Sequence, residues 1–123
     1  MASRFDLDKL RSALESSDLE RVMECYADDA RLDVVDHAHQ PAHPMSLRGK
    51  EQIRSFYQDI FGRQMTHHMN HEAMSNGHLS FVEECEYPDG CHVLAAQFVD
   101  IEGDKIARQL VIQAWDENPT ASP

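Results

Sequence analysis

Long apolar runs and cysteines are scarce in this sequence. No apolar run approaches the roughly 20 residues that a membrane-spanning helix needs, and the opening MASRFDLDKL lacks the apolar segment of a signal peptide. Cys25, Cys85 and Cys91 form an odd set without metal-type spacing, which favours reduced thiols. A bridge between Cys85 and Cys91, which flank a turn, is the alternative. We therefore expect a soluble cytoplasmic protein with no membrane segment.

Basic residues are also few. The chain has 11 Lys and Arg against 22 Asp and Glu, which gives a formal net charge of −11. A surface this acidic repels phosphate backbones, so we expect no nucleic-acid partner. A length of 123 residues suits one domain with a real core. We expect this domain to span residues 1–117 and the polar, proline-containing tail 118–123 to be disordered.

Helical patterns occupy the first part of the chain. Leu7, Leu10 and Leu14 have the spacing of residues on one face of a helix. Ser17 and Glu20 have the spacing of a capping box, which predicts that a second helix begins at Ser17.

A change of pattern follows this second helix. Asp28 and Asp29 are expected to end it, because short acidic side chains compete for backbone groups. The β-branched composition predicts a strand over residues 31–36, and two prolines indicate a loop over 37–46. Helical periodicity returns over residues 50–62 and predicts a third helix.

The rest of the chain has a hydrophobic period of two, which indicates strands. Turn signals separate them, the strongest being Asn76-Gly77. The predicted strands cover residues 65–75, 78–87, 91–101 and 105–116. Helices followed by an antiparallel meander predict an α+β fold, in which helices cover one face of a curved sheet and an apolar hollow lies between them.

Two segments of the sequence resemble a known family. The stretch 25–33, CYADDARLD, and the stretch 47–57, LRGKEQIRSFY, are similar to hallmarks of the NTF2-like superfamily, and most of all to its SnoaL-like polyketide cyclases and ketosteroid-isomerase-type proteins. The resemblance implies an NTF2-like (cystatin-like) cone, with three N-terminal helices packed on a strongly curved, mostly antiparallel sheet. It covers nearly the whole chain and predicts the fold better than the reaction, since this fold hosts many functions.

The isomerase site does not carry over to this chain. Aligned on the shared motif, its catalytic base falls on Val34, its first-helix tyrosine on Leu10, and its protonated acid near Ala96 or Gln97. None of these side chains can play the corresponding part. Asp36 lies two residues beyond Val34 and faces the same way along a strand, so we expect it to be the base, with a pKa raised by apolar surroundings.

Histidines supply the second candidate catalytic group. Strand parity puts His67 and His68 on opposite faces. The resemblance implies that a histidine on this strand projects into the pocket, and His68 is the better match, with Asn70 beside it. We expect His68 to be the acid–base partner of Asp36. The alternative is that these are partly exposed side chains of the sheet.

A metal centre is the rival use of the histidines. His37, His39 and His43 lie close together in the predicted loop, and zinc or iron would accept three imidazoles. The loop has no acidic partner at a recognised interval, so we expect no metal and no cofactor. Glu83, Glu84 and Glu86 fit a solvated strand edge.

The last strand separates two kinds of surface. Gln113 and Trp115 share the face expected to line the hollow, where amides and an indole suit a ligand pocket. Leu110 and Ile112 share the other face, which would be exposed on a monomer, so we expect a homodimer through the outer face of the sheet. The full set of expected pocket residues is Val34, Tyr57, Asn70, His92, Gln97, Gln113 and Trp115.

Two functions remain open at this point. The first is a SnoaL-like enzyme that isomerises, cyclises or dehydrates a small hydrophobic carbonyl compound without a cofactor, with Gln97 or Gln113 donating to a developing enolate oxygen. The second is a non-catalytic module that uses the same hollow to bind a ligand, or that serves in dimerisation.

Overall fold

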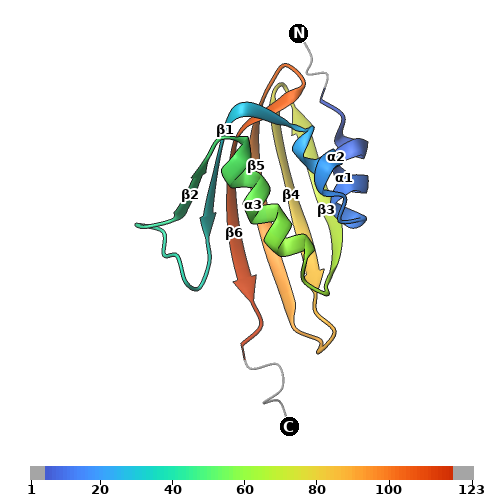
Figure 1. The fold of residues 1–123 in the computed structure, drawn as a ribbon, viewed down its shortest axis with the longest axis vertical. Helices are drawn as coiled ribbons and strands as arrows, with labels where there is room; N and C mark the ends of the chain where they lie inside the picture. Colours follow the sequence, from blue (N-terminus) through green and yellow to red (C-terminus); the bar gives the residue numbers. More distant parts are fainter. Residues whose placement is uncertain (1–4, 118–123) are drawn as a thin grey trace.

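A computed structural model describes residues 5–117, which form one six-stranded sheet covered by helices (Figure 1). The strand order is β2-β1-β6-β5-β4-β3, with β1 and β6 parallel and every other neighbouring pair antiparallel. The elements are α1 (Leu7–Glu15), α2 (Leu19–Met23), β1 (Tyr26–Val35), β2 (Met45–Arg48), α3 (Lys50–Phe61), β3 (Thr66–Ser75), β4 (His78–Glu86), β5 (His92–Glu102) and β6 (Lys105–Trp115).

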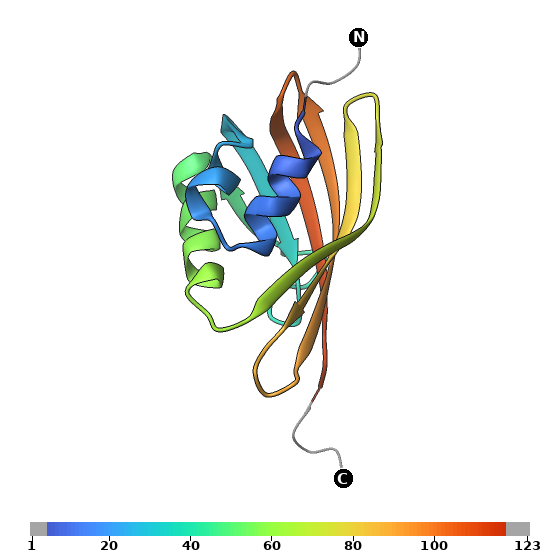
Figure 2. The ribbon, with the colours of Figure 1, turned by 90° about the vertical axis from the view of Figure 1, so that its right-hand side faces the viewer.

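The helices lie together on one face of the sheet, as Figure 2 shows from the side. The core is the layer between them, where Leu14 of α1, Val22 of α2 and Ile53 of α3 pack against Leu32 and Ile106 of the sheet. The α+β fold is therefore confirmed. The expectation of three N-terminal helices on a strongly curved sheet is met only in part, because α3 follows two strands and the sheet is not strongly curled.

The start of α2 differs from the prediction by one residue. Asp18 is the N-cap, and its carboxylate accepts a hydrogen bond from the Arg21 backbone N–H at 3.3 Å. Ser17 has a positive φ of 54° and lies in the turn before the helix. The capping box predicted at Ser17 is wrong, because the aspartate next to it caps the helix instead.

The first strand is longer than predicted. β1 begins at Tyr26 and includes Asp28 and Asp29, which the sequence analysis placed at the end of a helix. Both aspartates are exposed, so their polarity reflects the outer side of a strand rather than a helix terminus. β2 lies inside and just after the predicted loop and pairs antiparallel with β1, so that Leu32 lies opposite Leu47.

The four strands of the meander follow the prediction to within a residue or two. Asn76 and Gly77 form the first turn with φ of 42° and 83°, the conformation for which this pair was recognised. Cys25, Cys85 and Cys91 are all free, so the alternative bridge is not formed. No helix within residues 5–117 is long and apolar enough to cross a membrane.

Candidate functional site

A pocket of about 510 Å³ lies between α3, the loop after β1 and the inner face of β4–β6. Its walls are mostly apolar, with Phe56 and Ile60 on the helix side and Val93, Val111 and Trp115 on the sheet side. Its polar lining groups include Asp36, His39, Glu83, Gln97 and Gln113.

Asp36 and His39 form a pair on the wall of this pocket. Their backbones pair in an isolated bridge, and His39 Nδ1 lies 2.9 Å from Asp36 Oδ1. The Ala38 backbone N–H donates to the same oxygen at 2.9 Å. The carboxylate side chain is 15% exposed.

The pKa of Asp36 is lowered, although the sequence analysis expected it to be raised. Burial opposes the charged form, but hydrogen bonds from His39 and from the Ala38 N–H together outweigh it. Asp36 is therefore an ionised acceptor at neutral pH. It fixes the tautomer of His39, so that Nε2 is the nitrogen left to accept a proton.

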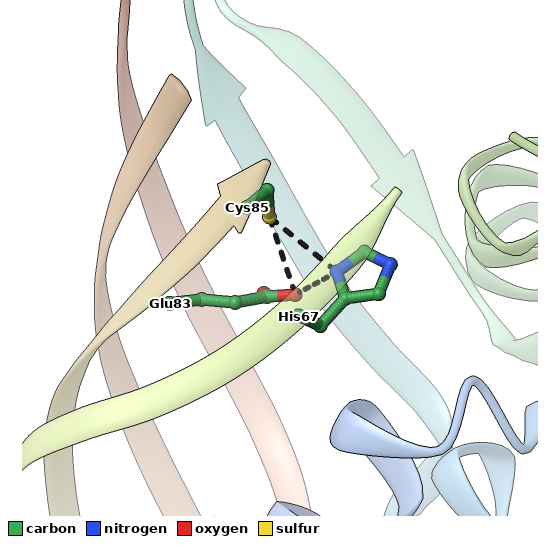
Figure 3. A group of neighbouring side chains, drawn as sticks. All are labelled: His67, Glu83 and Cys85. Atoms are coloured by element: carbon green, nitrogen blue, oxygen red, sulfur yellow. Dashed lines mark hydrogen bonds and ion pairs between the residues drawn. The ribbon is translucent and has the colours of Figure 1, made fainter. Parts of the chain in front are cut away.

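A second polar cluster crosses β3 and β4 (Figure 3). His67 Nδ1 lies 2.8 Å from Glu83 Oε2, and Gln97 Nε2 donates to Glu83 Oε1 at 2.7 Å. Cys85 Sγ lies 3.4 Å from His67 Nδ1. Among residues 5–117, His67, Glu83 and Cys85 are the one group of three metal-type side chains whose ligand atoms all lie within 4.8 Å of each other.

The cluster continues through the core as a chain of hydrogen bonds. Gln109 Nε2 donates to Gln97 Oε1, and the Tyr26 hydroxyl donates to Gln109 Oε1 at 2.5 Å. The Tyr26 and Tyr57 hydroxyl oxygens are 2.7 Å apart. Because the Tyr26 proton is already committed to Gln109, Tyr57 must be the donor of this last bond. Every link therefore donates toward Glu83.

Burial raises the pKa values of two tyrosines in this hydrogen-bond chain and of the neighbouring Cys85 thiol. It raises the pKa of Tyr26 well above its usual value, with the neighbouring Tyr57 adding to the effect. It also raises the pKa of Tyr57, with the nearby Glu83 carboxylate as a second cause. Burial and then Glu83 raise the pKa of the Cys85 thiol. All three groups are therefore protonated at neutral pH.

The far end of the pocket is aromatic and holds one oriented amide. Trp115 Nε1 donates to Gln113 Oε1 at 2.8 Å, which leaves the amide N–H groups of Gln113 as donors. The ring of His37 meets Trp115 edge-on, with centroids 5.2 Å apart. His37 and His39 therefore contact separate partners, Trp115 and Asp36.

Some of the expected site residues meet in this pocket and others do not. Asp36, Tyr57, Gln97, Gln113 and Trp115 line it. Val34 is fully buried in the core.

The remaining three expected residues lie elsewhere. The His68 side chain is 67% exposed and pairs with Glu15 at 3.0 Å, so Asp36 and His68 do not converge. His92 is exposed beside Asp116, and Asn70 donates to Glu84. For His68 the physical reason is strand parity: His67 and Met69 of β3 face inward, and His68 between them faces out.

The sequence did not identify His39 as the partner of Asp36, since His39 was considered only as a metal ligand, and it did not place His67 and Glu83 together. Glu83 was interpreted as part of a solvated edge, yet it is only 7% exposed. A signal was available, because Glu83 alternates with Phe81 and Cys85 and so shares their apolar face. His67 likewise shares its face with Met69. No comparable signal marked His39, which a turn in the loop brings to Asp36.

Known proteins of similar structure share the fold at low sequence identity. An NTF2-like protein of unknown function from Mesorhizobium loti has a TM-score of 0.76 and 8% identity, over 88% of this chain and 87% of its own. A provisionally assigned ketosteroid isomerase from Kribbella flavida has a TM-score of 0.73 and 14% identity, over 94% of this chain and 77% of its own. A SnoaL-like protein of unknown function from Burkholderia thailandensis has a TM-score of 0.67 and 17% identity, over 87% and 89%.

The family assignment comes from the sequence itself. Comparison with curated proteins found no match. The SnoaL-like domain, in contrast, matches residues 7–109, which include all three helices, strands β1 to β5 and the first part of β6. The chain belongs to the SnoaL-like domain family, within the NTF2-like superfamily.

Proposed function

We propose that this protein is a small-molecule enzyme that performs acid–base chemistry on a hydrophobic carbonyl compound. The observation that carries the proposal is the Asp36–His39 pair on the wall of an otherwise mainly apolar pocket. An imidazole oriented by an ionised carboxylate is a suitable general base near neutral pH. His39 therefore replaces His68 as the predicted partner of Asp36, and it also takes the role of base that was expected of Asp36.

Each group has one task in the proposed reaction. His39 Nε2 removes a proton from the carbon next to the substrate carbonyl, while Asp36 stabilises the imidazolium that forms. An N–H of Gln113 donates to the enolate oxygen, where charge appears only during the reaction. The enolate is then reprotonated, attacks a second carbonyl, or expels a hydroxyl group. These outcomes are isomerisation, aldol-type cyclisation and dehydration.

The pocket suits a ligand of this kind. Its volume of about 510 Å³ lies within the range of small-molecule sites, and a few polar groups interrupt an apolar lining. The known proteins of similar structure include the provisionally assigned ketosteroid isomerase, which supports the reaction class but not a substrate.

Proton exchange tests the proposal without knowledge of the natural substrate. The protein is incubated in D₂O with a panel of cyclic ketones and β-diketones, and loss of the proton signals next to the carbonyl is followed by NMR. For at least one compound we expect faster exchange than in buffer alone. In His39→Ala we expect the catalysed exchange rate to fall by about 100-fold or more. His43→Ala is the matched control, because His43 is an exposed histidine of the same loop outside the pocket.

A non-catalytic ligand-binding module is the second candidate. The lowered pKa of Asp36 favours it, because such a carboxylate is itself a weak base. This function predicts that compounds of the panel bind, as seen by ligand-detected NMR, while exchange stays at the buffer rate. Exchange that is catalysed equally by wild type and His39→Ala would contradict the assignment of His39.

We further propose a cytoplasmic homodimer formed through the outer face of the sheet. Leu94 and Phe98 of β5 lie beside Leu110 and Ile112 of β6, and all four are exposed. Contiguous apolar surface of this kind typically marks an interface. Three unpaired cysteines support a reducing compartment.

A further inference from the structure

The cluster of His67, Glu83 and Cys85 is separate from the Asp36–His39 pair and has no part in the proton transfer proposed above. His67 and Cys85 are direct partners in the β3–β4 register, and Glu83 precedes Cys85 by two residues on the same face of β4. The pairing of the two strands therefore brings the three side chains together, as Figure 3 shows. All three residues are buried, His67 with 5% and Glu83 and Cys85 with 7% of their surface exposed.

The three facing atoms have the spacing of ligands around one metal ion. Nδ1 of His67 lies 2.8 Å from Oε2 of Glu83 and 3.4 Å from Sγ of Cys85, and Sγ lies 3.7 Å from Oε2. Ligands of tetrahedral zinc lie about 3.3 to 3.8 Å apart, given the usual Zn–N, Zn–O and Zn–S bond lengths. Only the N–O edge, now a hydrogen bond, would have to lengthen.

Neighbouring groups already hold the carboxylate in a ligating orientation. Gln97 donates to Oε1 of Glu83 at 2.7 Å, which leaves Oε2 free to face His67 and Cys85. Gln109 in turn donates to Gln97. Outer hydrogen bonds of this kind orient the ligands of metal sites and raise metal affinity.

The cluster buries polar groups that are incompletely paired, which is unfavourable if its role is only structural. Glu83 is a buried carboxylate without a lysine or arginine among its hydrogen-bond partners. His67 Nε2 is buried and has no hydrogen-bond partner. Buried polar groups in folded proteins are normally fully paired, so a bound ion that engages this cluster gives the arrangement a reason.

We propose that His67, Glu83 and Cys85 bind one divalent transition-metal ion of the zinc class. Nδ1, Oε2 and Sγ are its protein ligands. Glu83 and Cys85 line the pocket, so a fourth position is open to a pocket ligand or water. The Cys85 thiol loses its proton to solvent, and the Nδ1 proton of His67 is replaced by one on Nε2. Two anionic ligands then balance the 2+ charge.

Cobalt(II) reports on such a site directly. Chelator-treated protein is titrated with cobalt(II), and zinc binding is measured by calorimetry in buffers of different ionisation enthalpy. We expect one equivalent of metal, a thiolate-to-cobalt charge-transfer band, and release of about one proton per ion, from the thiol. Cys85→Ser should lose the band, whereas Cys91→Ser, a change at another buried free cysteine, should keep it.

Several results would overturn the site. One is a wild-type protein without the charge-transfer band; another is a band that persists in Cys85→Ser or disappears equally in Cys91→Ser. Loss of binding in His43→Ala would place the ion on the histidine loop instead. If Cys85→Ser fails to fold by circular dichroism, X-ray absorption of the zinc-loaded wild type decides: one sulfur neighbour at about 2.3 Å supports the site, and nitrogen and oxygen neighbours alone reject it.

Discussion

Gln97 Nε2 lies 2.7 Å from Glu83 Oε1, and this bond joins β5 to β4 inside the core. Gln97 accepts from Gln109 with its carbonyl and donates to Glu83 with its amide, so its orientation is fixed from both sides. The chain of donors that begins at Tyr57 therefore ends on a carboxylate. Gln97 is the link on which both ends depend.

Replacing Gln97 with leucine should be costly although the side chain is similar in size. Gln97→Leu leaves the Glu83 carboxylate and the Gln109 amide without their partners in a buried setting. We expect the free energy of unfolding to fall by at least about 2 kcal/mol in urea denaturation followed by circular dichroism. Gln113→Leu is the matched control and should cost less, because Gln113 is half-buried. Equal losses of unfolding free energy in the two variants would contradict the proposed importance of the hydrogen-bond chain.

The two tyrosines should respond differently to loss of their hydroxyls. Tyr26→Phe removes both the donor to Gln109 and the acceptor of Tyr57, and should cost about 1–3 kcal/mol of unfolding free energy. Tyr57→Phe removes the first donor of the hydrogen-bond chain but leaves the bond from Tyr26 to Gln109 in place, and should cost about 1 kcal/mol. Thermal unfolding of both variants beside wild type measures the order. If Tyr57→Phe lost more unfolding free energy than Tyr26→Phe, the inferred direction of donation between the two hydroxyls would be wrong.

The lowered pKa of Asp36 predicts a pH dependence of stability. A carboxyl group whose pKa is lower in the folded protein contributes stability above its unfolded pKa, near 3.8, and that contribution is lost as pH falls through the folded pKa. Wild type should therefore be more stable than Asp36→Asn at pH 7, and the difference should shrink below about pH 4. Melting temperatures across this range measure it.

Asp29→Asn controls for the loss of one negative charge. Asp29 is an exposed residue of β1, the strand that Asp36 directly follows. If Asp29→Asn gives the same pH profile as Asp36→Asn, the effect reflects net charge and the hydrogen bonds of Asp36 are not its cause.

A charge on the outer face of the sheet should separate the proposed dimer. Phe98 is 51% exposed beside Leu110, at the centre of the apolar face. Phe98→Lys would place a lysine in each half of a two-fold interface and should raise the dimer dissociation constant by about 100-fold or more. Analytical ultracentrifugation measures this constant. Gln58→Lys on the exposed side of α3 should have no effect, and a monomeric wild type would contradict the proposal.

The sequence was a good guide where local rules decide the structure. Asn76-Gly77 and the later turn signals set the ends of the meander, because these residues adopt backbone conformations that most others avoid. β2 and the first half of β1 were missed, since Met45–Arg48 is short and becomes a strand only by pairing with β1. Tertiary pairing, which no local pattern encodes, made the difference.

The site was predictable only in part for a similar reason. Parity on β6 correctly placed Gln113 and Trp115 at the pocket, because the alternation of that strand is regular from Arg108 to Trp115. On β3 the same rule separated His67 from His68, but the choice between them followed a resemblance, and the structure puts His68 outside. The partner of Asp36 could not be predicted, because His39 reaches it through a turn of the loop.

The parallel pairing of β1 with β6 has a consequence for how the chain acquires its structure. β1 comes early in the sequence, yet its neighbour in the middle of the sheet is the last strand. During synthesis on a ribosome, β1 and β2 therefore have α3 to pack against but lack their sheet neighbour until almost the entire polypeptide has emerged. Closure of such a long loop slows folding, and a chain truncated before β6 would leave the Asp36–His39 pair without the sheet wall of its pocket.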